Sequence, residues 1–363
     1  MPPVTLFRYL SMRTLLAITA LAAALSSLIL LVDLIENLRF ADKFDGDFMF
    51  AMNLSLLRTP ALAQTMLPFV FLFGSIWLFT QLNRRAEIAV MRSAGLSVWR
   101  LIGPAAFVAT VVGFLIITMF DPVATGMRAA GEVMKDRLRG ANSSVVRVFG
   151  DGIWLRQRDA GNILIINARE FDAERATLTD VTMWRLDSQS NFLERVDAPE
   201  ASFSGRTLEL HKARVKAPGQ RLDQRTPVYA VITTLTPADL RERLESPETL
   251  SLWRLPKFIL LAESAGLPTT RYNIRFHDLC STPLKLLAMV LIAAVFSLRP
   301  MRSGGAFKLF ILAIGAGFGL YILSEIATAL GESGFAPVAL AAWTPAIVAA
   351  IAALTGLLQF EEG

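Results

Sequence analysis

The sequence holds few residues whose type and spacing could carry out catalysis. Its single cysteine is Cys280, and its two histidines, His211 and His277, lie far apart. They form no cluster with the spacing of a metal site. The chain has neither a glycine-rich phosphate loop ending in Lys-Ser/Thr nor a serine nucleophile elbow. We therefore expect a non-catalytic chain that binds no metal or cofactor, so any ATP that its function requires must be hydrolysed by another subunit.

Segment 84–95 is the most distinctive polar stretch. It reads Arg-Arg-Ala-Glu-Ile-Ala-Val-Met-Arg-Ser-Ala-Gly. Gly95 suits the position just after a helix C-terminus, and Ser97 suits the N-cap of the next helix. These signals predict a short helix with one charged and one apolar face. A solvated connector has no need of its isoleucine, valine and methionine, which favours docking to a partner protein.

Ionisable residues within or beside apolar segments form a second group of candidates, because charged side chains are costly in a membrane. Asp33 lies near the end of an apolar segment, where interfacial solvation and a functional role are both open. Glu325 lies well inside another, where we favour a side chain that faces the bundle interior or a cavity. Arg39 and Lys43 are four residues apart and would share one face if their helix continues.

The elements around these residues are predominantly apolar. The chain has 363 residues, 53% hydrophobic and only 18% charged, whereas ordinary soluble domains are about 25% charged. The net charge of +5 could indicate nucleic acid in a soluble protein, but the sequence has no recognisable basic motif, so we expect a membrane and no nucleic acid. Six segments are long and apolar enough to cross a bilayer: Leu15–Ile35, Ala61–Thr80, Leu101–Phe120, Leu279–Leu298, Ala306–Leu330 and Ala336–Phe360.

Loop charge predicts the orientation of these spans. Arginine and lysine are abundant before the first span and in the loops after the second and fourth spans, whereas the loop around Glu332 has neither. Positively charged loops stay in the cytoplasm. Both termini and the two basic loops are therefore predicted to be cytoplasmic, and the long segment after the third span is predicted to lie outside.

That long segment changes to short strand-like runs separated by glycine-containing turns, a pattern typical of a sandwich or jellyroll. Its apolar face would by default be its own core, and an open groove for acyl chains is the alternative. Two amphipathic stretches, 128–139 and 250–265, flank it. The runs are Ser144–Val148, Gly152–Arg158, Asn162–Ala168, Thr177–Leu186, Ser202–Ser204, Thr207–Val215 and Val228–Leu235.

The order of these features resembles the lipopolysaccharide-export permeases of the LptF/LptG (YjgP/YjgQ) family. The resemblance covers essentially the whole chain. The end of the fourth span is more similar to LptG than to LptF. The residues that carry the resemblance are Arg8-Tyr9, the loop Glu87–Gly95, Arg271-Tyr272, and the run from Pro283 through Ala288-Met289 to Leu298-Arg299.

The resemblance implies a membrane α-helical bundle of six transmembrane helices with an inserted periplasmic all-β jellyroll-like domain. The implied division is 1–125, with a coupling helix at about 84–95, then 126–270 for the β domain with its flanking helices, and 271–363. The implied function is an LptG-like permease subunit of the inner-membrane ABC transporter that extracts lipopolysaccharide and drives it toward the outer membrane.

The implied partners are an LptF-like permease, an LptB-like ATPase dimer, and LptC-like and LptA-like periplasmic proteins. The chain could instead be an LptF-type paralogue of the same complex, a membrane receptor or scaffold with a periplasmic β sensor domain, or a mechanotransmitting protein that carries no substrate through its bundle. Co-purification with a soluble ATPase would separate the permeases from the receptor.

The resemblance also assigns candidate sites. LptG sequences often carry a basic residue near the position of Leu30 that reaches for lipid A phosphates. This chain departs from that pattern, so Arg39, Lys43 or a later basic group is expected to substitute. The ATPase-coupling residues implied are Arg85, Glu87, Ile88, Met91, Arg92 and Gly95. The candidate substrate-binding residues are Leu28, Leu31, Asp33, Ile35, Arg39, Lys43, Lys135, Arg137, Arg139 and Glu325.

Overall fold

The computed structural model divides into two compact units, Met1–Gly131 with Asn273–Gly363, and Glu132–Tyr272. The residues that it describes are 3–44, 46–138, 145–149, 152–159, 162–172, 175–187, 189, 191–205, 207–217, 224–233, 247–264, 269–298 and 306–362.

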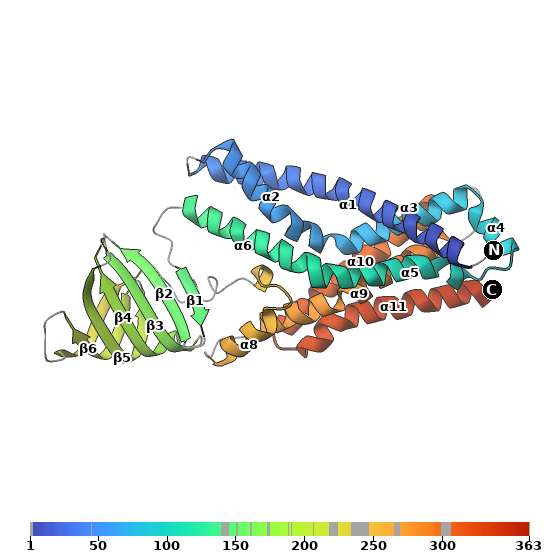
Figure 1. The fold of residues 1–363 in the computed structure, drawn as a ribbon. Helices are drawn as coiled ribbons and strands as arrows, with labels where there is room; N and C mark the ends of the chain where they lie inside the picture. The colour runs from blue at the N-terminus through green and yellow to red at the C-terminus, as the bar shows by residue number, and fades with distance from the viewer. Residues whose placement is uncertain are drawn as a thin grey trace. The chain divides into compact units, whose positions relative to one another are not determined.

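The first unit is a helical bundle (Figure 1). Among the described residues, five helices are long and apolar enough to cross a membrane, or up to six if the bent pair α2 and α3 forms one span. The predicted membrane-helical fold is therefore confirmed. The helices are α1 (Pro3–Asp42), α2 (Phe48–Thr65), α3 (Leu67–Arg84), α4 (Glu87–Ser93), α5 (Val98–Leu115), the π-helical turn η1 (Ile116–Phe120), α6 (Asp121–Leu138), α9 (Thr270–Ser297), α10 (Ala306–Glu332) and α11 (Val338–Glu362).

The second predicted span is not one straight helix. Ala61–Thr80 covers the end of α2 and most of α3, and these two helices meet at an angle of 64°. Pro68 lies in the first turn of α3. A proline is tolerated there because the first N–H groups of a helix have no partner within it, whereas a proline inside one continuous helix would break it. The apolar composition continues through this break, so the hydrophobic pattern alone concealed it.

The core of the bundle lies between α3, α5 and α9, whose large side chains are almost fully buried, among them Phe71 and Phe79 at 1% exposure. Close backbone approaches tighten it. A Cβ placed on Gly113 of α5 would lie 2.6 Å from the Cα of Pro283 in α9, and one on Gly317 of α10 would lie 2.2 Å from Leu72 Cδ2. These glycines therefore allow neighbouring helices to touch.

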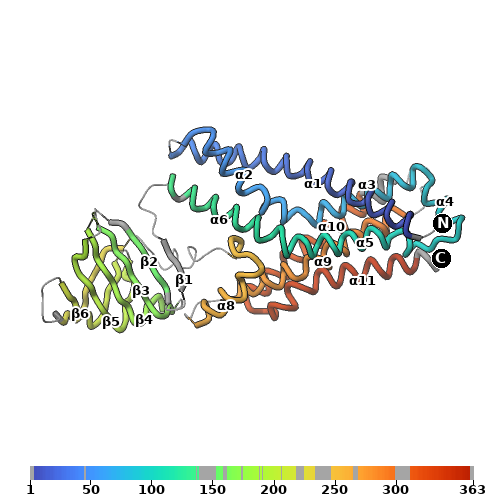
Figure 2. The backbone as a smooth tube through the Cα atoms, viewed as in Figure 1, coloured from blue at the N-terminus to red at the C-terminus, as the bar shows by residue number. Residues whose placement is uncertain are grey.

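The outer helices leave much of their apolar surface uncovered. In the most apolar stretches of α1 and α10, only 6% and 17% of the residues are buried. The start of α1, the helix α4 and the end of α11 lie at the same end of the bundle (Figure 2). This placement agrees with the predicted grouping of both termini with the basic loop.

The second unit contains the predicted all-β domain as one seven-stranded antiparallel sheet whose order follows the sequence, β1 to β7. β4 begins and ends at the predicted residues. β5 begins at Phe192, ten residues before the predicted run Ser202–Ser204. The first half of this strand contains charged residues, which concealed it in the sequence. The strands are β1 (Val145–Phe149), β2 (Gly152–Asp159), β3 (Asn162–Asp172), β4 (Thr177–Leu186), β5 (Phe192–Ser204), β6 (Thr207–Lys216) and β7 (Gln224–Ile232), and the short helices after them are η2 (Pro247–Thr249) and α8 (Leu255–Ser264).

Candidate substrate-contacting and coupling sites

The second half of α1 presents an apolar stripe on its surface. Leu28, Leu31 and Ile35 are 56%, 58% and 55% exposed, and Val32, which the sequence reasoning did not select, is 60% exposed. Spacings of three and four residues put all four on one face of the helix, and together they are called the α1 stripe. Because so much of these side chains is uncovered in the described chain, lipid, substrate or another protein must cover them.

Two cations follow the α1 stripe. The helix continues unbroken to Asp42, so Arg39, four residues after Ile35, falls on the same face, and its side chain is exposed. Lys43 is also exposed and follows the last helical residue. The helix thus continues past the apolar run as far as Arg39, whereas Lys43 lies just beyond its end. The resulting surface is apolar along its length and positive at its end.

The opposite side of the same helical segment is polar and buried. Asn37 donates from Nδ2 to Asp33 Oδ2 at 2.6 Å and to Ser55 Oγ at 2.9 Å. Arg58 of α2 lies 3.2 Å from Asp33 Oδ1 and donates to Asn37 Oδ1 at 3.4 Å. These four residues, which we call the α1–α2 clasp, compensate each other's buried charge and polarity. They hold the second half of α1 against α2.

The α1–α2 clasp changes the interpretation of Asp33. The sequence suggested a substrate contact, but Asp33 is 4% exposed and faces away from the α1 stripe, where it is paired with Arg58. Sequence reasoning missed Arg58 because it lies just before the predicted second span. The available signal was that Arg58 is the one charged residue in an otherwise apolar helix, which calls for an acidic partner nearby.

The predicted short helix in the basic loop is α4, which is bounded by two left-handed residues. Ala86 precedes it with φ 57°, and Gly95 follows it with φ 80°. Gly95 is thus in the conformation expected just after a helix C-terminus. Ser97 is the N-cap of α5, as predicted, although its side chain makes no capping hydrogen bond. The two turns fix the direction of α4 between α3 and α5.

Glu87, the first residue of α4, is bound to the beginning of α1. Tyr9 donates its hydroxyl to Glu87 Oε2 at 3.0 Å, and Arg13 donates to Oε1 at 3.2 Å. The guanidinium of Arg13 also lies over the Tyr9 ring, 4.7 Å from its centre. Arg13 and Glu87 are about a quarter exposed. These three residues, called the α1–α4 clamp, join the predicted coupling helix directly to the helix that carries the α1 stripe.

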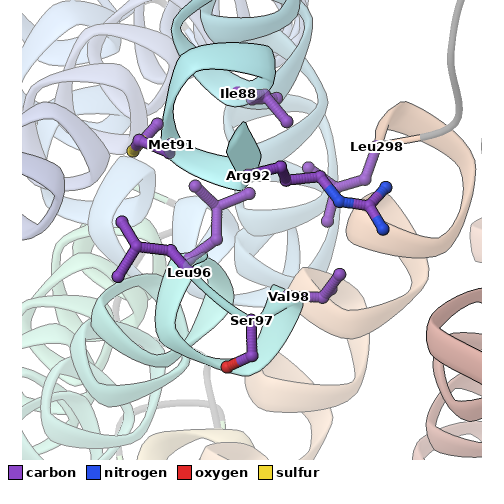
Figure 3. Close-up of a pocket in the computed structure, with 8 residues that line it drawn as sticks. Ile88, Met91, Arg92, Leu96, Ser97, Val98 and Leu298 are labelled. Carbon is purple, nitrogen blue, oxygen red and sulfur yellow. The ribbon is translucent and has the colours of Figure 1, made fainter. Parts of the chain in front are cut away.

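The apolar side of α4 packs against the chain's own bundle. Ile88 is 4% exposed. With Met91, Leu96 and Leu298 it encloses a cavity of only about 10 Å³ (Figure 3), about the space of one water molecule. The sequence assigned Ile88 and Met91 to contact with a partner, whereas the structure places them where they anchor α4.

The surface that α4 leaves for a partner is formed by other residues. Val90 is 65% exposed, and Arg85 and Arg92 are exposed on either side of it. A hydrophobic side chain between two cations can enter a pocket while the arginines pair with acidic or backbone acceptors at its rim. The exposed surface of α4 is therefore small and basic.

The other candidate substrate residues are dispersed. Lys135 is half-buried and Arg137 is exposed near the end of α6, and both belong to the unit Glu132–Tyr272. Arg139 lies outside the described residues. Glu325 is exposed on α10, where Tyr321 hydrogen-bonds it, so it does not face the interior of this chain's own bundle, and its expected position beside a cavity stays a prediction. The packed side of α10 is instead formed by residues such as Gly317.

A second buried ion pair joins α6 to α9, and the sequence gave no sign of it. Asp121 is 0% exposed. Gln64 donates to its Oδ1 at 3.0 Å, and Arg275 lies 3.4 Å from the same oxygen. These residues are so far apart in sequence that only the folded bundle brings them together. Their position beside the π-helical turn and the break between α2 and α3 suits a structural role, because irregular backbone needs polar support.

The residues at these sites have the properties of binding surfaces. Within the described ranges, no group of three or more His, Cys, Asp or Glu is placed to hold a metal ion. The sites instead offer an apolar helix face ending in cations, a basic coupling surface and buried ion pairs that position both.

Comparison with known proteins agrees with this arrangement. The family described as "Lipopolysaccharide export system permease LptF/LptG" matches residues 8–359. A protein from Haemophilus influenzae named "Lipopolysaccharide export system permease protein LptG" is 24% identical over 327 residues, which cover 89% of each chain. A protein of the same name from Escherichia coli strain K12 is 23% identical over 328 residues, which cover 88% of this chain and 86% of the relative. The chain therefore belongs to the LptF/LptG family of lipopolysaccharide export permeases.

Proposed function

We propose that this chain is the LptG-type permease subunit of an ABC transporter that extracts lipopolysaccharide from the bacterial inner membrane and drives it toward the outer membrane. The observation that carries the proposal is the α1 stripe, an uncovered apolar face that ends in Arg39 and Lys43. The relatives named LptG support the choice of subunit.

The α1 stripe fits the two parts of lipopolysaccharide. Lipid A has several acyl chains, which gain about 25 cal/mol for each Å² of apolar surface they cover. Its phosphates need cations at the membrane interface, where a partly desolvated pair is stronger than in bulk water. Arg39 and Lys43 lie at the end of the apolar face, so they can take the place of the basic residue that LptG sequences often carry near the position of Leu30.

A separate LptB-like ATPase dimer would bind the basic surface of α4. The α1–α4 clamp then gives the ATPase a direct connection to the substrate helix, because α1 is one continuous helix of 40 residues, about 60 Å long. The carboxylate of Glu87 can accept about four hydrogen bonds, so it can pair with an ATPase cation while Tyr9 and Arg13 remain bound.

The uncovered faces of α1 and α10 suit a second permease subunit of the LptF type, which would complete a shared bundle. The chain would lie in the inner membrane with both termini and α4 in the cytoplasm and its β domain in the periplasm, where LptC-like and LptA-like proteins receive the lipid. The runner-up, an LptF-type paralogue, rests on the same family match and would exchange the two permease positions.

Reversing both cations to Glu, as Arg39→Glu with Lys43→Glu, tests the lipid site. Lipopolysaccharide crosslinking from a photoreactive residue at Ile35 should fall, while the complex still assembles. Arg175→Glu is the matched control, because Arg175 is 83% exposed in the β domain. Unchanged crosslinking and export in the double variant would remove the headgroup role.

Topology and partner choice are tested separately. A cysteine replacing Arg92 should react with an impermeant thiol reagent only from the cytoplasmic side, and one replacing Lys212 only from the periplasmic side. Periplasmic labelling at Arg92 would contradict the orientation. Co-purification of an ATPase with the intact chain distinguishes the permease from the receptor or scaffold alternative, which predicts none.

A further inference from the structure

One face of β7, the last strand of the β domain, is covered and the other is exposed. Along β7, Val228, Ala230 and Ile232 are exposed, whereas Tyr229 and Val231 alternate with them on the covered side. Val231 is 4% exposed. This alternation shows that one face of β7 closes onto the apolar interior.

Thr233, just after β7, reaches across to β2. Its hydroxyl donates to Gln157 Oε1 at 2.9 Å, and these residues are 3% and 1% exposed. In the strand order, β3, β4, β5 and β6 separate β2 from β7. Neighbouring strands lie about 4.8 Å apart, so β2 and β7 would be about 24 Å apart in a flat sheet. The sheet must therefore roll until its ends meet over the interior.

A second contact crosses the same interior. Tyr229 donates its hydroxyl to Glu194 Oε1 at 2.6 Å, and Arg185 lies 2.9 Å from the same oxygen. On β6, Leu210 pairs with Tyr229, while Lys216 pairs with Arg195, the neighbour of Glu194. Six residues span about 20 Å along a strand, too far for a contact within a flat sheet.

Burial and the hydrogen bond to Glu194 raise the pKa of Tyr229 to about 12, so its hydroxyl keeps the proton that it donates in the second contact.

The surfaces held together by these contacts are apolar. Leu155 on β2 and Met183 on β4 are 1% and 0% exposed on the covered face. An acyl chain could replace Val231 against such residues with little change in free energy, because one apolar contact replaces another. It could not replace the hydrogen bonds of Gln157 or Glu194, which must be separated or given to water.

We propose that the contacts Tyr229–Glu194–Arg185 and Thr233–Gln157 are two polar latches that keep the interior of the β domain closed, and that β7 must part from β2 and β5 before acyl chains enter. This inference rests on the proposed function. It assigns the β domain a gate in addition to a path, because the latches hold the apolar interior closed against water.

Reversible crosslinking across the Thr233–Gln157 latch tests the gate in the full chain in cells. Gln157→Cys and Thr233→Cys, in a Cys280→Ser background, are joined by a short bis(methanethiosulfonate) crosslinker, which forms a reducible disulfide with each thiol and releases methanesulfinate. Photo-crosslinking of labelled lipopolysaccharide is then measured from a small diazirine amino acid at Met183, and separately at Ile35. The locked protein should lose the Met183 adduct and keep the Ile35 adduct, and it should recover the Met183 adduct when the crosslinker is reduced.

Three outcomes would overturn the gate. The locked protein could form the Met183 adduct at the unlocked level, or the unlocked protein could form only the Ile35 adduct. Loss of both adducts in the unlocked protein would instead remove the proposed function itself, and the gate with it. As a second variant, Tyr229→Phe keeps the ring but removes the donor. It should raise the Met183 adduct by about tenfold or more, as expected for the loss of one hydrogen bond to a charged group, and an unchanged or lower yield in folded protein contradicts the latch.

Discussion

Removing Arg58 should release the second half of α1 from α2. Arg58→Met keeps most of the side-chain length but leaves the Asp33 carboxylate, whose side chain is 5% exposed, without its cation. Breaking a buried ion pair from one side costs about 3–5 kcal/mol. Asn37 still donates to Asp33. We therefore expect a loss of about 3 kcal/mol.

The free energy of unfolding can be measured for the purified chain in detergent micelles by titration with SDS, followed by tryptophan fluorescence. Asp33→Asn combined with Arg58→Met removes both charges, so it should recover most of the loss and come within about 1 kcal/mol of the wild type. Arg39→Met is the matched control, since this exposed cation should change stability by less than about 0.5 kcal/mol.

Two results would refute the reasoning about the α1–α2 clasp. If Arg58→Met unfolds at the wild-type SDS concentration, Asp33 does not depend on Arg58. If the double variant is as unstable as Arg58→Met alone, the cost is lost packing of the arginine stem and not an unpaired charge.

Further predictions address the coupling helix, the bundle core and the β domain. Glu87→Lys should reduce co-purification of the ATPase without unfolding the bundle, because a partly exposed ion pair contributes only about 0.2–1 kcal/mol to stability; normal ATPase binding and stimulation would count against it. Gly113→Leu should destabilise the helical unit by about 1–3 kcal/mol or more, since its Cβ would meet Pro283 at 2.6 Å, and an unchanged melting temperature would disprove this contact. Hydrogen bonds from the side chain and backbone of Asn191 lower the pKa of Asp187, so its stabilisation of the β4–β5 turn is present above about pH 4 and lost below it; hydrogen exchange in that turn, corrected for its intrinsic pH dependence, should show the loss, and Asp187→Ala should abolish the pH dependence.

Local signals predicted much of the fold. Gly95 indicated the end of α4, and its φ of 80° is the conformation that ends a helix. The alternating run Thr177–Leu186 is β4 itself. In each case a few neighbouring residues determine the structure, so the sequence pattern is sufficient.

Contacts between distant residues could not be predicted in the same way. Asp121 and Arg275 are brought together only by the packing of α6 on α9. Ile88 was assigned to a partner because the sequence of α4 does not show which of its faces packs against the bundle. The rolled β sheet was likewise hidden, since no local pattern relates Gln157 to Thr233.

Photo-crosslinking from Ile35 in the reconstituted complex, with and without ATP, tests most directly whether this chain carries lipopolysaccharide. Ile35 is the last residue of the exposed α1 stripe, about one helical turn before Arg39. The proposed function predicts a lipopolysaccharide adduct that forms without ATP and decreases when ATP is added, as the lipid leaves the bundle. Adducts with phospholipid alone, or a lipopolysaccharide adduct that ATP does not change, would contradict it.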